Sequence, residues 1–170
     1  MEQEMTNSTP KRPTFLTVLC ILTFIGSAWG IVGGFTSIMT AKTYGKVMDA
    51  AKQDMGTVTD SLSTVTSSAS AEAATEMINT MVGSINEDTI RNNGIASIIA
   101  SIFTLVGALL MWKLRKMGFW VYVLGVLISI VAPVMIYSGN LLGAISAIGM
   151  GFIGILFIIL YAVNRKHLVN

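Results

Sequence analysis

Residues 11–34 of the chain read KRPTFLTVLCILTFIGSAWGIVGG, and the fold depends on how this stretch is interpreted. Two basic residues, an apolar run and the small residues Gly26-Ser27-Ala28 are typical of a cleaved signal peptide. The uncharged run, however, extends over residues 13–41. A signal peptide has an apolar core of about 7–15 residues, whereas a spanning helix needs about 20. Because apolar residues also continue beyond Ala28, we expect a retained transmembrane helix over residues 13–41.

The composition of the whole chain also indicates a membrane protein. Of its 170 residues, 53% are hydrophobic and 12% are charged, against a usual charged fraction of about 25%. The formal net charge of +2 is too small to indicate a nucleic-acid partner, and we expect none. Cys20 is the single cysteine and lies in an apolar run, so the chain contains neither an intramolecular disulfide nor a cysteine redox pair.

Three further runs contain no Asp, Glu, Lys, Arg or His, at residues 94–112, 118–137 and 141–163. Backbone groups in lipid must be hydrogen-bonded within their own segment, so each run is expected to be an α-helix. The connections at residues 113–117 and 138–140 are short, which makes the last three helices antiparallel neighbours. The predicted fold class is an all-α membrane protein, with four transmembrane helices in an antiparallel bundle and an extracytoplasmic helical hairpin between the first two.

The positions of Lys and Arg predict the orientation. Seven of the eleven fall on one side of a four-span arrangement, in a disordered tail at residues 1–12, in the turn at 113–117 and in a tail at 164–170. Short cytoplasmic segments carry such an excess. Residues 42–93 contain four basic and seven acidic residues. We therefore expect both termini in the cytoplasm and residues 42–93 outside.

Residues 42–93 are predicted to form an amphipathic helical hairpin. Apolar residues recur at spacings of four and three, as on one face of a helix, and a turn is predicted at residues 66–70. The predicted seam between the two helices contains Met48, Met55, Leu62, Met77 and Met81. Two interpretations remain open. The helices bury their apolar stripes against each other, or the seam docks onto a partner or a second copy, because so small a unit buries little apolar surface.

Small residues recur every four positions in the first and last predicted spans: Gly26, Gly30 and Gly34, and Gly143, Ala147 and Gly151. Small residues let helix backbones approach closely in lipid. These six residues are expected either to pack the helices within the bundle or to form a face for a second copy or a partner. Pro133 lacks a backbone donor and is predicted to kink the third spanning helix.

The predicted spans lack the side chains on which proton relays and ion-coupled transporters usually depend. His167, the single histidine, lies in a basic tail, and no Walker loop, metal-ligand cluster or Ser/His/Asp set is identifiable. We therefore expect no enzymatic activity, no cofactor and no metal.

The stretch KRPTFLTVLCILTFIGS at residues 11–27, followed by a glycine-rich end to the run, resembles the opening of small uncharacterised bacterial four-span membrane proteins with a long outer loop after the first helix. The resemblance implies a location in the bacterial inner membrane and supplies no functional residue. The favoured function is a non-enzymatic structural or accessory subunit that binds other membrane or periplasmic proteins. A passive channel or a transporter of lipids or small molecules is the alternative.

Overall fold

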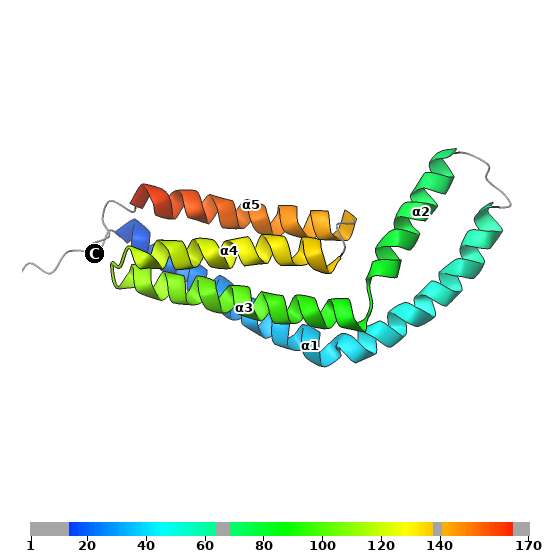
Figure 1. The fold of residues 1–170 in the computed structure, drawn as a ribbon, viewed down its shortest axis with the longest axis horizontal. Helices are drawn as coiled ribbons and strands as arrows, with labels where there is room; N and C mark the ends of the chain where they lie inside the picture. The colour runs from blue at the N-terminus through cyan, green and yellow to red at the C-terminus, as the bar shows by residue number, and fades with distance from the viewer. Residues whose placement is uncertain (1–13, 64–68, 138–140, 165–170) are drawn as a thin grey trace, which may run out of the picture.

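The described part of the chain is entirely helical. The computed structural model describes residues 14–63, 69–137 and 141–164, and only the backbone of residues 55, 57–63, 69–72 and 74. These ranges form five α-helices and no strand (Figure 1), namely α1 (Thr14–Ser63), α2 (Ala69–Ser84), α3 (Glu87–Trp112), α4 (Met117–Ile136) and α5 (Leu141–Asn164). The prediction of an all-α fold is confirmed.

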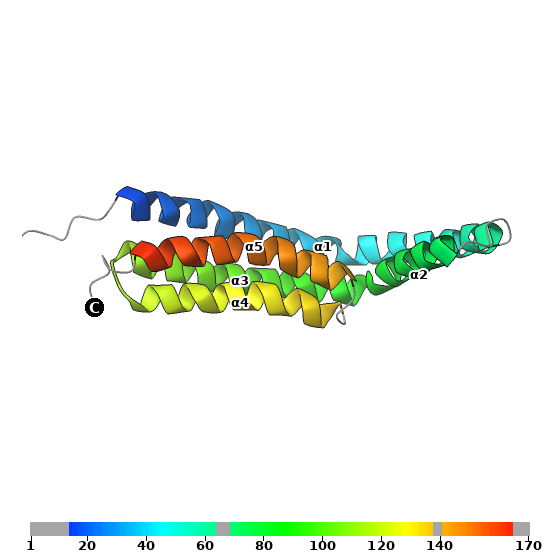
Figure 2. The same ribbon diagram turned by 90° about the horizontal axis from the view of Figure 1, so that it is seen from above.

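Four of the described helices are long and apolar enough to cross a membrane: residues Thr14–Asp54 of α1, and all of α3, α4 and α5. At 1.5 Å per residue, the 20 residues of α4 extend about 30 Å, which matches the hydrocarbon core of a bilayer. α3, α4, α5 and the first half of α1 lie along a common direction in a bundle (Figure 2). The fold is consistent with a multi-pass membrane protein.

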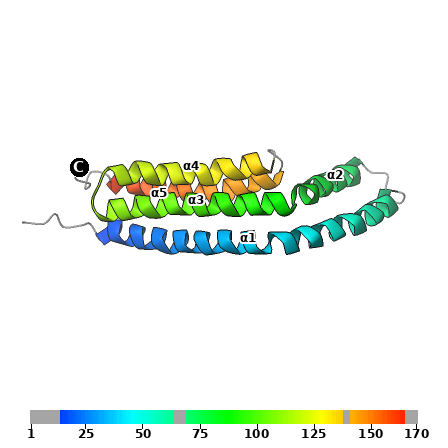
Figure 3. The same cartoon turned by 60° about the horizontal axis from the view of Figure 1, so that its bottom comes forward.

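α1 is much longer than a spanning helix. Its 50 residues extend about 75 Å, and its second half continues beyond the end of the bundle (Figure 3). Hydroxyls donate hydrogen bonds to carbonyls four residues back, from Thr36 to Val32 (2.8 Å), from Ser37 to Gly33 (2.9 Å) and from Thr40 to Thr36 (2.7 Å). Such bonds often bend a helix. α1 changes direction where its colour turns from blue to cyan in Figure 1.

α2 follows the second half of α1 and leads back towards the bundle (Figure 1). It contacts α1 and α5 only sparsely. Several predictions fall outside the described residues: most of the turn at 66–70, the tails 1–12 and 165–170 with His167, the turn at 138–140, and the side chains of Met55 and Leu62. These stay predictions.

α3 begins at Glu87, whereas the apolar run predicted a start at residue 94. The cause is a reciprocal cap, in which the Thr89 backbone N–H donates to the Asn86 side chain and the Asn86 N–H donates to Thr89 Oγ1, both at 2.9 Å. Glu87 and Asp88 then lie in the first turn, where the helix dipole favours negative charge. The first two turns of α3 therefore belong to the segment 42–93 that was predicted as the hairpin.

A tight turn joins α3 to α4. The Arg115 N–H donates to the Leu110 carbonyl and the Leu114 N–H to the Met111 carbonyl, both at 2.9 Å, which is the pattern of a Schellman cap. Leu114 has φ 59°, the left-handed conformation that glycine usually supplies at this position. Its side chain is buried, and this packing offsets the backbone strain.

The bundle has one well-filled half, which lies beside this turn. The most extensive helix contacts are those between α1 and α3, between α3 and α4, and between α4 and α5. In the turn half, large side chains form a continuous buried core of Leu16, Leu19, Cys20, Met111, Leu114, Phe119, Tyr122, Val126 and Tyr161. The rings of Tyr122 and Tyr161 meet edge to face, with centroids 5.0 Å apart.

Pro133 is buried inside α4, and the helix continues beyond it to Ile136. The Tyr137 N–H donates to the Pro133 carbonyl (3.0 Å). A kink at Pro133 stays a prediction.

Candidate functional site

A seam of small and hydroxyl-bearing residues joins α1 to α3. Along α1 its members follow one another at spacings of three and four: Cys20, Thr23, Ser27, Gly30 and Gly34. This spacing keeps the side chains on one face of a helix. Because every member is small or polar, the two backbones approach closely and the polar groups bond between helices.

Three hydrogen bonds cross the seam between α1 and α3. The Cys20 thiol donates to the Ala108 carbonyl (3.7 Å), the hydroxyls of Ser27 and Thr104 lie 2.9 Å apart, and the Ser97 hydroxyl donates to the Gly30 carbonyl (3.2 Å). On the α5 side, the hydroxyls of Thr23 and Tyr161 bond at 2.8 Å. Such bonds join helices in an apolar surrounding.

The three glycines predicted on α1 have different surroundings. A methyl group added at Gly34 would lie 2.6 Å from the Gly94 carbonyl oxygen, and one at Gly30 would collide with the Ser101 hydroxyl. At Gly26 an added methyl would meet no atom within 4 Å. Gly30 and Gly34 therefore lie in the α1–α3 contact, whereas Gly26 faces open space.

The three small residues predicted on α5 lie on its side towards α4. A methyl group at Gly143 would lie 3.0 Å from the Pro133 carbonyl oxygen, and one at Gly151 would lie 3.4 Å from the Ile130 side chain. Ala147 is half-buried, and with Gly151 it lines a shallow depression on the outside of the bundle.

Sequence reasoning did not single out the glycines that join α3 to α4 as site residues. Methyl groups at Gly107 and Gly118 would lie 2.6 Å from backbone atoms of the facing helix, and one at Gly125 would lie 2.8 Å from the Thr104 N–H. Gly118 and Gly125 are seven residues apart, which is two helical turns. That spacing was a usable sequence signal for a packing face.

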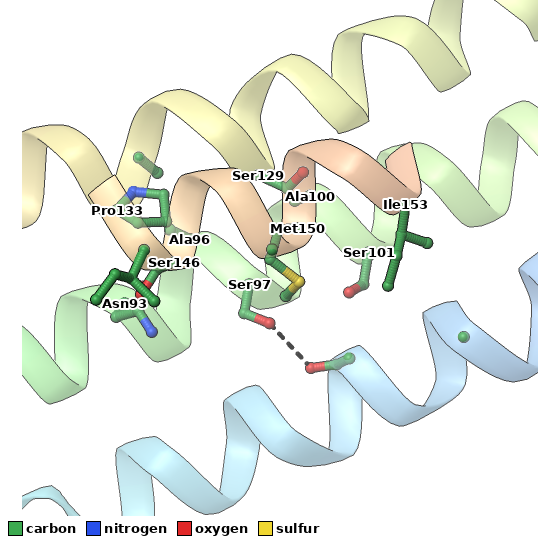
Figure 4. A pocket seen from close by; sticks show the side chains of 15 residues that line it. Asn93, Ala96, Ser97, Ala100, Ser101, Ser129, Pro133, Ser146, Met150 and Ile153 are labelled. Atoms are coloured by element: carbon green, nitrogen blue, oxygen red, sulfur yellow. Dashed lines mark hydrogen bonds between the residues drawn. The ribbon is translucent and has the colours of Figure 1, made fainter. Parts of the chain in front are cut away.

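The half of the bundle away from the α3–α4 turn contains a cavity of about 540 Å³. Four helices line it (Figure 4): α1 with Gly26 and Gly30, α3 with part of residues 93–101, α4 with Ser129 and Pro133, and α5 with Ser146 and Ile153. Most of its lining is glycine, alanine, serine or apolar side chain. The small residues that bring the helices together here do not fill the space between α1 and α5.

The polar groups of the cavity are neutral. They come from Asn93, Ser97, Ser101, Ser129 and Ser146. Ser97 bonds across to α1, and the Ser129 hydroxyl donates to the Val126 carbonyl of its own helix (2.7 Å). Since no Asp, Glu, Lys, Arg or His is among the lining residues, the cavity suits an apolar ligand with an uncharged hydrogen-bonding group.

A second region of interest is the surface of α2 and the second half of α1, which we call the outer surface. Its apolar side chains Tyr44, Val47 and Met77 are 54%, 56% and 54% exposed. Met48 and Met81, which were predicted between the two helices of the outer hairpin, are half-buried. Exposed ion pairs flank the region, Lys52–Asp49 (3.3 Å) and Arg91–Asp88 (3.0 Å), and pairs of this kind add little stability.

Within the described ranges, no three His, Cys, Asp or Glu side chains are grouped as they would be around a metal ion. Comparisons with protein-family models, with curated proteins and with solved structures found no match. The cavity and the outer surface are therefore the features of the molecule that bear on its function.

Proposed function

We propose that the protein is a non-enzymatic accessory or structural subunit of the bacterial inner membrane, which binds another membrane or periplasmic protein through its outer surface. The observation that carries this proposal is the exposure of Tyr44, Val47 and Met77 among charged residues. Large apolar side chains exposed to water favour a contact surface, because leaving them uncovered forfeits the free energy of burial.

Charge separates this surface from the lipid-facing sides of the bundle. Lys42, Lys46 and Asp49 are exposed on the same stretch of α1 as Tyr44 and Val47. Three charges within eight residues are costly in hydrocarbon, so this stretch belongs in water. Exposed apolar residues nearer the N-terminus of α1, such as Val32, need no partner because lipid covers them.

The proposed topology has four spans, with α2 and the second half of α1 as an extracytoplasmic hairpin and both termini in the cytoplasm. The basic residues Lys113, Arg115 and Lys116 in the α3–α4 turn support this orientation. The hairpin then stands on the periplasmic side of the membrane, where it reaches proteins that the spans cannot.

Co-purification with variants that introduce a charge on the outer surface tests the proposal. The tagged chain is extracted in a mild detergent, and its complex is sized and its components are identified. A stoichiometric partner is expected with the natural sequence and is expected to be lost in Val47→Glu and Met77→Glu. Asn79→Glu is the matched control, because Asn79 is exposed two residues after Met77 on another face of α2 and is already polar.

A monomer without a partner, or a complex that survives both apolar-to-Glu changes, contradicts the proposal. A complex that contains only further copies of this chain, and that Met77→Glu abolishes, identifies the partner as a second copy.

The cavity favours a second candidate function, a passive channel or a transporter of lipids or small molecules. The filled core of Met111, Tyr122 and Tyr161 lies between the cavity and the α3–α4 turn, which argues for a pocket closed at that end. Flux through reconstituted vesicles above that of empty vesicles, reduced by Gly26→Leu, supports transport. Equal flux with and without the protein counts against it.

A further inference from the structure

The cavity lies between α1 and α5, within the bundle of apolar helices. These two helices touch only sparsely, and the cavity opens between them. Gly26 on one wall and Gly149 on the other are both exposed, and an added methyl group at either would meet no atom within 4 Å. The mouth therefore lies on a side of the bundle that a bilayer covers.

The floor of the cavity is enclosed. Ala100 and Ser101 line it, yet they are only 4% and 9% exposed. An α-helix with its side chains is about 10–12 Å across, too wide to reach residues this deeply enclosed. A single alkyl chain is far thinner than a helix and is the better fit to such a space.

The cavity runs along the bundle from Asn93 at one end to Ser101 and Ile153 at the other (Figure 4). Ser101 lies eight positions after Asn93 in α3, which corresponds to about 12 Å. Asn93 comes directly before the apolar run that starts at Gly94, so the Asn93 end is expected at the membrane interface.

An empty cavity in a membrane protein is unfavourable because its walls lack atoms to contact. A lipid chain that moves from the bilayer into the cavity exchanges one apolar surrounding for another, and it restores those contacts. The half-buried amide of Asn93 and hydroxyl of Ser146 are available to donate to an ester carbonyl at the interface end.

We propose that this cavity binds one acyl chain of a membrane glycerolipid. The ester group lies at Asn93 and Ser146, and the chain extends to the floor at Ala100 and Ser101. The volume of about 540 Å³ lies within the range of about 300–1,000 Å³ that ligand sites occupy. This inference does not depend on the proposed protein partner, because the outer surface takes no part in it.

Photocrosslinking in vesicles tests the inference with the full chain. The protein is reconstituted in phosphatidylethanolamine and phosphatidylglycerol, with a phospholipid that carries a diazirine in its acyl chain, and labelled residues are mapped by peptide mass spectrometry. Label is expected on Ala100 or Ser101, which lipid reaches only through the cavity. Ile148 and Phe152 on the exposed side of α5 report ordinary contact with surrounding lipid.

Gly26→Leu combined with Gly149→Leu places two large side chains at the mouth, where an added Cβ meets no atom within 4 Å, so the floor label is expected to be lost while Ile148 and Phe152 remain labelled. Gly33→Leu is the matched control. Gly33 is exposed in the same helix, an added methyl there also meets nothing within 4 Å, and it does not line the cavity. This variant should retain the floor label.

Three outcomes overturn the inference. In the first, Ile148 and Phe152 are labelled in the natural sequence and the floor is not. In the second, the floor label persists when both mouth glycines are leucine. In the third, a free fatty acid with the same diazirine labels the floor and the phospholipid does not, which shows a fatty-acid site and not a glycerolipid site.

Discussion

The two halves of the bundle are packed differently. Beside the α3–α4 turn, large side chains such as Met111, Tyr122 and Tyr161 fill the space between helices. In the other half, Gly34 and Gly94 bring two backbones together, but a cavity remains between α1 and α5. Small residues bring α1 and α3 close together, but they are too small to fill the space between α1 and α5. The turn half is thus the scaffold, and both proposed binding regions lie towards the other end.

The largest expected effect on the free energy of unfolding is in the filled half of the bundle, beside the α3–α4 turn. Met111 is fully buried, so Met111→Ala should lower the free energy of unfolding by about 2–5 kcal/mol through lost contacts and a new void. Unfolding in detergent, followed by circular dichroism, measures it. Met117→Ala is the control, since Met117 is 67% exposed at the start of α4 and should change stability by less than about 0.5 kcal/mol. Equal effects of the two changes would show that the turn half has no tightly filled core.

The next effect concerns the close contact of α1 and α3. Gly34→Leu places its Cβ against the Gly94 carbonyl and the Ile98 side chain, and overpacking of this kind costs about 1–3 kcal/mol. We expect a cost at the upper end of this range, because the Gly94 carbonyl belongs to the backbone and cannot rotate away as a side chain can. Gly33→Leu, one residue along, meets no atom within 4 Å and should leave the unfolding midpoint unchanged. A neutral Gly34→Leu would show that the helices are not held this closely.

A smaller effect is expected for the hydrogen bond between Thr23 and Tyr161. Tyr161→Phe keeps the ring in the core and removes only the hydroxyl that bonds Thr23 at 2.8 Å. Interhelical bonds of this kind contribute about 0.6 kcal/mol on average and up to about 1.7. The same unfolding measurement on Tyr161→Phe, Thr23→Val and the double variant gives the coupling energy. Strict additivity would mean that the bond adds nothing.

The smallest effect is expected for Gly26→Leu, which should change the free energy of unfolding by less than about 0.5 kcal/mol because its side chain enters open space. This result would sharpen the comparison with Gly34→Leu, since both glycines belong to one sequence pattern. Strong destabilisation by Gly26→Leu, measured in the same unfolding assay, would place Gly26 in a helix contact.

The apolar runs were sufficient to predict the helical fold, because four long uncharged segments have few alternatives in a membrane. The start of α3 was not predicted, since its first two turns carry Glu87, Asp88 and Arg91 and depend on the Asn86–Thr89 cap. A search for capping pairs within the polar segment would have found that signal.

The predicted glycine pattern and the observed α1–α3 contact differ for a geometric reason. A step of four residues rotates the side chain by about 40° around a helix with 3.6 residues per turn, so Gly26, Gly30 and Gly34 drift across the face. The residues of α1 that contact α3 follow one another at alternating steps of three and four, and they include Ser27 instead of Gly26. The cavity depends on the distance between α1 and α5, which no spacing along one helix reveals.

Crosslinking from the two ends of the molecule tests most directly whether its binding surface lies at the outer end. Met77→Cys places a reactive thiol at an exposed position of α2, and Met117→Cys places one at an exposed position beside the α3–α4 turn. The native Cys20 is fully buried and is not expected to react. With a photoreactive maleimide in native membranes, a defined heavier adduct is predicted from Met77→Cys and none from Met117→Cys. No adduct at position 77, or the same adduct from both positions, would contradict the account.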